Sequence, residues 1–347
     1  MEKRKYFTKL DSAFMFMCSI IIPQLAGVII VMLLGLIMNI FGSNYANFSS
    51  SLFGELVLSS ITSLVFIAIL IFYSHYKKID IKSATHLNKK INYINIFCGI
   101  CIGITAVYLF SPLISMVDAF LINIGYTITG EIPILTGSAG TLILGILVLA
   151  ILPSIAEELM FRGAILNGLK KHGVIKAVLI SALCFMLMHT SPQQTVYQFI
   201  LGIIFGYAVY STGSIYMGML IHFVNNLIVV INAQYSLTHS ITAETFTFTA
   251  SNIIIAILSL IVGTLIIWGI FKINNKLNKI LIKNIKDDET IFNEQEKVSE
   301  ITNISSEQIN YLQRADSATT KKYWRIGFAV SIFLWFAVLI SSLSYFS

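Results

Sequence analysis

The sequence predicts an all-α fold: a polytopic transmembrane helical bundle of about nine spans, with its N-terminus in the cytoplasm. Of its 347 residues, 56% are hydrophobic and 12% are charged, and the mean hydropathy is +0.81. Soluble domains carry about 25% charged residues. Apolar runs of about 20 residues, the length that crosses a bilayer, recur along nearly the whole chain. These observations exclude a soluble two-domain protein of the same length.

The expected spans follow one another with short connections. The first run, residues 13–41, follows four basic residues and is too long for the core of a signal peptide, so it is expected to be an anchor. Eight more runs lie at residues 56–73, 94–116, 141–168, 176–189, 194–210, 214–232, 251–271 and 324–345.

Basic residues predict the orientation, because cytoplasmic loops are enriched in Lys and Arg. All but one of the 23 basic residues lie near the N-terminus, in segments 74–93, 169–176 and 272–323, or at Arg325. The intervening segments contain none, which predicts a cytoplasmic N-terminus and an external C-terminus. Basic residues scattered over short loops do not form a nucleic-acid-binding surface. We therefore expect a multi-pass protein of the cell membrane whose surroundings are the lipid bilayer, with no nucleic acid as partner.

The exceptional basic residue, Arg162, lies in the fourth run beside two glutamates. Ionisable groups facing lipid are costly, so these three are expected to face a protein interior or a wet cavity. Glu158 and Arg162 are four residues apart, which predicts an ion pair on one helix face. Glu157 points away from that face and is the candidate general base. Pro153 cannot donate to the carbonyl of Leu149, which predicts a kink nearby.

Two of the six histidines, His189 and His222, lie within or at the end of a predicted span. A lone buried histidine is usually structural, but Asn226 follows His222 by four residues and shares its helix face. Counting about 1.5 Å per residue from each cytoplasmic helix end places Glu157 roughly 16 Å deep, His189 roughly 20 Å and His222 roughly 12 Å. The overlapping depths favour one site over separate structural residues.

A carboxylate, two imidazoles and an amide are suited to activating water and stabilising an oxyanion, as peptide hydrolysis requires. The sequence has no Gly-x-Ser-x-Gly and no His-Glu-x-x-His motif. Water is therefore the expected nucleophile.

These residues resemble the CPBP family of intramembrane endopeptidases, which includes the type II CAAX prenyl proteases and bacterial bacteriocin-processing or immunity proteins. The family pattern is Glu-Glu-x-x-x-Arg, then Phe-x-x-x-His, then His-x-x-x-Asn or Asp. The matching residues are Glu157, Glu158 and Arg162, then Phe185 and His189, then His222 and Asn226.

The resemblance implies a role for each motif residue. Glu157 and His189 would activate the attacking water, while His222 and Asn226 would stabilise the tetrahedral oxyanion. The remaining motif residues would give structural support: Glu158, Arg162 and Phe185.

The family has been described both as metal-dependent and as glutamate-dependent. We favour hydrolysis without a metal cofactor, because Asn is a poor zinc ligand and no further carboxylate is within reach. The metalloprotease-like alternative is a zinc ion held by Glu157, His189 and His222.

The resemblance and the hydropathy pattern divide the chain into five parts. They are the N-terminal transmembrane helices (1–140), a CPBP-like catalytic core (141–232), an additional transmembrane helix (233–271), a polar cytoplasmic linker with some amphipathic helix (272–323) and a C-terminal transmembrane helix (324–347).

The expected activity is that of a membrane-embedded peptidase acting on a membrane-associated peptide or protein. Its role would be CAAX-type processing, bacteriocin or pheromone maturation, or immunity, and the Ile-, Asn- and Lys-rich composition is typical of a low-GC bacterium. The alternative is a non-proteolytic immunity or scaffolding protein in which the charged layer only fixes helix packing. A proton-coupled transporter with Glu157 as relay is less favoured, because paired broken helices are lacking. The oligomeric state is left open.

Overall fold

The computed structural model describes residues 3–42, 52–128, 135–239, 247–289 and 318–343. Within these ranges all regular elements are helices, which confirms the predicted all-α class. In chain order the α-helices are α1 Lys9–Ile40, α3 Leu52–Tyr76, α4 Ile81–Ala84, α5 Tyr93–Asn123, α6 Ala139–Gly145, α7 Leu152–Glu158, α8 Asn167–Leu169, α9 Val174–Met188, α10 Thr195–Thr212, α11 Ile215–His239, α12 Ala250–Glu289 and α14 Ala318–Ser341. Between them lie the π-helical stretches η1 Ile146–Ile151 and η2 Leu159–Leu166 and the 3-10 turn η3 Lys170–His172.

Eight helices in the described part of the chain are long and apolar enough to cross a membrane, and they coincide with eight of the nine predicted runs. The elements from α6 to η3 form one of these spans, Ala139–His172. The remaining predicted run, 176–189, corresponds to α9, which has 15 residues. At about 1.5 Å per residue it rises about 22 Å, less than the roughly 30 Å of hydrocarbon. The number of crossings and the cytoplasmic N-terminus stay predictions.

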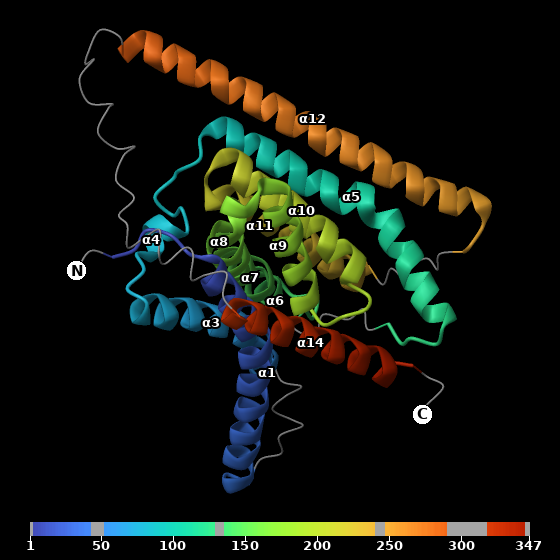
Figure 1. The fold of residues 1–347 in the computed structure, drawn as a ribbon. Coiled ribbons are helices and arrows are strands. Elements are labelled where there is room, and N and C mark those ends of the chain that lie inside the picture. The colour runs from blue at the N-terminus through green and yellow to red at the C-terminus, as the bar shows by residue number, and fades with distance from the viewer. Residues whose placement is uncertain (1–2, 43–51, 129–134, 240–246, 290–317, 344–347) are drawn as a thin grey trace.

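Figure 1 shows how the helices are arranged. The segment from α6 to α11 occupies the middle of the molecule, and α12 packs along α5 at one edge. Helix α1 packs against α14 and projects beyond it. Helix α11 contacts α5, α7, α10 and η1, so it is the element on which several others converge.

The span that carries the charged residues is not a regular α-helix. The π-helical η1 ends just before α7, whose first turn contains Pro153, and the π-helical η2 begins directly after Glu158. Proline removes one donor from the helical ladder, and wider π turns are often found at functional sites. Pro153 thus follows a π-helical stretch closely, and the kink predicted near it stays a prediction.

Helix α12 does not end where the apolar run ends, because it continues for 18 residues beyond position 271. Asn278 holds this extension against the start of α5. Its Oδ1 accepts from Asn92 Nδ2 at 2.5 Å, and its Nδ2 donates to Asn95 Oδ1 at 2.9 Å. The first part of the predicted polar linker is therefore helical, and its residues 290–317 lie outside the described ranges.

A buried ion pair fixes the start of α1. Asp11 Oδ2 accepts from Arg4 Nη2 at 2.7 Å and from the backbone N–H and hydroxyl of Thr8, each at 2.7 Å. Tyr73 of α3 donates its hydroxyl to Asp11 Oδ1 at 2.6 Å. Both carboxylate oxygens have partners, so this fully buried acid joins α1 to α3.

Candidate active site

The ion pair predicted from the four-residue spacing is present. Arg162 Nη1 donates to Glu158 Oε1 at 2.7 Å, and both side chains are completely buried. Arg162 Nη2 donates to the carbonyl of Gly202 at 3.3 Å. The guanidinium carbon lies 4.3 Å from the ring centroid of Phe185 and 5.1 Å from that of Phe205. Aromatic faces attract cations, so α9 and α10 both help to hold this charge in the core.

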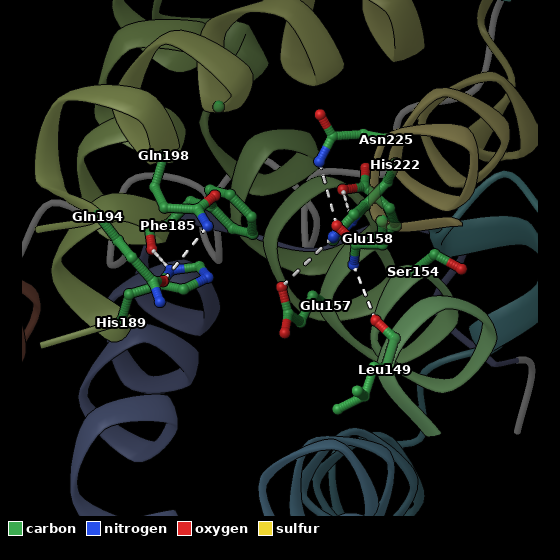
Figure 2. Close-up of polar contacts among 12 residues, drawn as sticks. Leu149, Ser154, Glu157, Glu158, Phe185, His189, Gln194, Gln198, His222 and Asn225 are labelled. Carbon is green, nitrogen blue, oxygen red and sulfur yellow. Dashed lines mark hydrogen bonds and ion pairs between the residues drawn. The ribbon is translucent and has the colours of Figure 1, made fainter. Parts of the chain in front are cut away.

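His222 of α11 contacts both glutamates, as Figure 2 shows. Its Nδ1 lies 3.2 Å from Glu158 Oε1, and its Nε2 lies 3.9 Å from Glu157 Oε2. Its ring stacks on Phe205, with centroids 4.8 Å apart. Glu158 therefore orients His222 as well as pairing with Arg162, a contact that spacing within one helix does not reveal.

A glycine makes room for the Glu158 carboxylate beside α11. A Cβ atom added to Gly218 would lie 2.5 Å from Glu158 Oε2 and 2.7 Å from Val209 Cγ2. Glu158 Oε2 itself is buried, with no hydrogen-bond partner among the described residues. Gly218 lies one turn before His222, and this four-residue spacing is its only signal in the sequence.

The third expected helix contributes His189, which follows the last residue of α9. Its Nδ1 lies 2.8 Å from the carbonyl oxygen of Phe185. A carbonyl only accepts, so Nδ1 carries the proton and Nε2 keeps a lone pair. Thr190 follows with φ +48°, a left-handed conformation that is unusual for a β-branched residue. The turn after His189 is therefore held by its surroundings and not by local preference.

Phe185 lies at the centre of these groups. Its fully buried ring packs edge-on against His189, with centroids 4.8 Å apart, and against His222, with centroids 5.8 Å apart. It also lies under the guanidinium of Arg162. Phe185, which was predicted to support the site, lies on α9 and contacts site residues next to α9, on α11 and on η2.

Glu157 is the most accessible of the three charged side chains in this span. Its side chain is 11% exposed, whereas Glu158 and Arg162 are 0% exposed. In Figure 2 it lies between His222 and His189, but it makes no direct hydrogen bond to His189. The structure therefore brings Glu157 to His222 directly and leaves His189 beyond it.

Asn226, which shares a helix face with His222, is bonded to η1 and to its neighbour on α11. Its Nδ2 donates to the carbonyl of Leu149 in η1 at 3.2 Å, and this is the carbonyl to which Pro153 cannot donate. Its Oδ1 accepts from Nδ2 of Asn225 at 3.1 Å. Asn225 is buried and does not stand out in the sequence except as the neighbour of Asn226.

The helices that form the site also carry a family signature. Residues 139–228 match the family model described as type II CAAX prenyl endopeptidase Rce1-like. This match confirms the predicted resemblance. The Rce1-like segment runs from α6 into α11 and contains both glutamates, both site histidines and Asn226. No curated protein and no solved structure matches the chain.

The Rce1-like segment supports a CAAX-type membrane endopeptidase at the level of the family. The candidate spans agree with a multi-pass membrane protein. A peptidase of this kind acts on a peptide or protein, and the site described above supplies a carboxylate and two imidazoles from three helices.

Glu157, His189 and His222, the candidate zinc ligands, do not form a metal site in this structure. Within the described ranges, no three side chains of the His, Cys, Asp and Glu types converge on one position. Glu157 and His222 are close, and the bond from Nδ1 of His189 to the carbonyl of Phe185 leaves Nε2 as its ligand atom, but this atom does not converge with the other two side chains. We therefore derive no step through zinc, and hydrolysis without a metal cofactor stays a proposal.

Proposed function

We propose that the protein is an intramembrane endopeptidase that hydrolyses a peptide bond of a membrane-associated peptide or protein with an activated water. One observation carries the proposal. Glu157 is the accessible carboxylate in a buried charged layer, and its Oε2 lies 3.9 Å from His222 Nε2. The other acid of this layer, Glu158, already holds Arg162 and His222.

The proposed reaction begins with a water molecule held by Glu157 and by the lone pair of His189 Nε2. Glu157 takes a proton from this water, and the oxygen attacks the carbonyl carbon of the scissile peptide bond. The proton then passes to the peptide nitrogen as the carbon–nitrogen bond breaks. The products are a new carboxyl terminus and a new amino terminus.

Oxyanion stabilisation is assigned to His222 and Asn226, which donate from Nε2 and Nδ2 to the carbonyl oxygen as it becomes negative. Glu158 supports this role, because its contact with Nδ1 keeps His222 in one orientation. Donation from Nε2 in the proposed reaction uses the doubly protonated form of His222, because Nδ1 already faces the carboxylate of Glu158.

The proposed substrates are membrane-associated. The family description is that of a type II CAAX prenyl endopeptidase, which suggests CAAX substrates, and a bacterial composition suggests bacteriocin or pheromone precursors. We propose the cell membrane as the location, with cleavage towards its cytoplasmic half.

The test uses the full chain in phosphatidylethanolamine and phosphatidylglycerol vesicles. The probe is an internally quenched peptide that ends in a farnesylated CAAX sequence. We expect cleavage by the wild type, a loss of about a thousand-fold in Glu157→Gln, and wild-type rates in Glu55→Gln, which changes a glutamate of α3 outside the site. Mass spectrometry of new termini in membranes of expressing cells extends the test to other substrates.

Two outcomes would overturn the proposal. One is full activity in Glu157→Gln. The other is a wild-type protein that neither cleaves the peptide nor generates termini that depend on Glu157, as expected if the charged layer only packs helices in an immunity or scaffolding protein.

A further inference from the structure

A chain of hydrogen bonds crosses from α10 to η1 through two neighbouring asparagines. The hydroxyl of Tyr197 donates to Asn225 Oδ1 at 2.5 Å, and Asn225 Nδ2 donates to Asn226 Oδ1 at 3.1 Å. Asn226 Nδ2 then donates to the carbonyl of Leu149 at 3.2 Å. Three elements, α10, α11 and η1, are joined in one line.

The chemistry of the two ends fixes the direction of every bond. The carbonyl of Leu149 only accepts, so Asn226 presents its amide nitrogen to it and its oxygen to Asn225. Asn225 must then present its nitrogen to Asn226 and its own oxygen to Tyr197. That oxygen needs a donor, which the Tyr197 hydroxyl supplies.

This direction matters because the two ends of a side-chain amide have nearly the same shape. Hydrogen-bond partners, and not packing, decide which end faces which way. Reversing Asn226 would bring its oxygen against the carbonyl oxygen of Leu149. Reversing Asn225 would bring its oxygen against Oδ1 of Asn226, so two acceptors would face each other.

The arrangement leaves one donor free for chemistry. An amide nitrogen carries two hydrogens, and one of those on Asn226 is used by Leu149. Within the described residues the second makes no hydrogen bond. It is the hydrogen that an oxyanion in the proposed reaction would accept.

We infer that Tyr197 and Asn225 are positioning residues that hold the Asn226 amide with its N–H, and not its oxygen, available to the reacting carbonyl. This inference rests on the proposed peptidase function. It adds two residues outside the family motifs, and it assigns the carbonyl of Leu149, four residues before Pro153, as the fixed end of this chain of hydrogen bonds.

The first test removes only the Tyr197 hydroxyl. In the vesicle assay with the farnesylated peptide, Tyr197→Phe should lower kcat about ten-fold or more, because an oxyanion donor is no longer held in place. KM should change little. The matched control is Tyr210→Phe on the same helix, whose ring is 46% exposed and which should keep wild-type kcat and KM.

A second variant breaks the line at its middle. In Asn225→Asp the carboxylate still accepts from Tyr197 but cannot donate to Asn226, so kcat should fall at least as far. Residues of one network are not additive. The double variant Tyr197→Phe/Asn225→Asp should therefore lose no more than Asn225→Asp alone, whereas independent structural damage would multiply the two losses.

A measurement without substrate separates this inference from the proposed function. In detergent-solubilised protein labelled with 15N-asparagine, the side-chain amide signal that disappears in Asn226→Asp identifies Asn226. That signal should shift in Tyr197→Phe and stay in place in Tyr210→Phe. An unchanged signal, or a Tyr197→Phe enzyme with wild-type kcat, overturns the inference. A wild-type protein without peptidase activity contradicts the proposed function instead, and the amide signal still decides the role of Tyr197.

Discussion

Two arginine–carboxylate pairs, one at the start of α1 and one between α7 and η2, differ in how completely their carboxylates are satisfied. Asp11 at the start of α1 uses both oxygens, with partners from Arg4, Thr8 and Tyr73. Glu158 uses only Oε1, which serves Arg162 and His222 together, and its Oε2 has no partner in the described structure.

The difference shows what each pair is suited to do. A carboxylate with both oxygens hydrogen-bonded stabilises one arrangement of its neighbours. A carboxylate that also holds an imidazole transmits its position to a second titratable group, at the cost of an unsatisfied atom. The Arg4–Asp11 pair is therefore suited to a structural role. The Arg162–Glu158 pair is suited to supporting His222.

The largest effect is expected from removing the arginine of the site. Arg162→Met should destabilise the protein by about 3–5 kcal/mol, because Glu158 would remain as a buried charge without its cation. A thermal unfolding measurement in detergent checks this. A melting temperature close to the wild-type value would show that the pair contributes little.

A smaller effect should distinguish the N-terminal pair from the site. Asp11→Asn keeps the shape but removes the charge that Arg4 and Tyr73 bind, so we expect a loss of about 1–3 kcal/mol. Cleavage per folded molecule should not change. If Asp11→Asn lowered kcat in folded protein as strongly as a Glu158→Gln variant does, the two pairs would not differ in function.

Gly218 offers a way to disturb Glu158 without changing any polar group. Gly218→Ala places a methyl group against Glu158 Oε2, and overpacking of this kind costs about 1–3 kcal/mol. Peptidase activity should fall because His222 moves with its partner. Gly269→Ala on α12, where a Cβ atom meets nothing within 4 Å, is the control and should behave as wild type.

The smallest effect concerns a histidine outside the spans. His86 Nδ1 lies 3.0 Å from the carbonyl of Gly213, and its Nε2 lies 3.0 Å from Lys170 Nζ. Burial, and secondarily the charge of Lys170, lower the pKa of His86 below its ordinary value. The folded protein favours neutral His86, so this stability is present above about pH 6.5 and declines as the pH falls below it.

The measurement is the melting temperature between pH 7.5 and pH 5. We expect a modest decrease at low pH in the wild type and a smaller one in His86→Gln. An equal decrease in both proteins would assign the pH dependence to other groups.

The sequence predicted the features that can be derived from the length and residue spacing of each helix. Hydropathy gave the fold class, and the spacing of Glu158 and Arg162 predicted their ion pair. Similar depths predicted that the helices carrying Glu157, His189 and His222 meet. Each rests on periodicity or length, which the chain encodes locally.

The features that the sequence did not predict depend on which faces of neighbouring helices pack together. The contact between Glu158 and His222 and the space at Gly218 arise where α7 faces α11. The hydrogen bond from Tyr197 to Asn225 arises where α10 faces α11. Hydropathy alone also ended α12 too early, because it does not register the asparagine contacts at Asn278.

The shortness of α9 has a consequence for the supply of water. If α9 begins at the cytoplasmic interface, as its basic flank predicts, it ends about 8 Å short of the opposite side of the hydrocarbon. Non-helical backbone at that depth is tolerated only inside protein or beside water. The polar turn that follows His189, from Thr190 to Gln194, meets this condition if the bilayer thins and hydrates there. Hydrolysis consumes water, which the hydrocarbon of the bilayer excludes. A helix that ends before the far side of the bilayer lets water approach the site from that side.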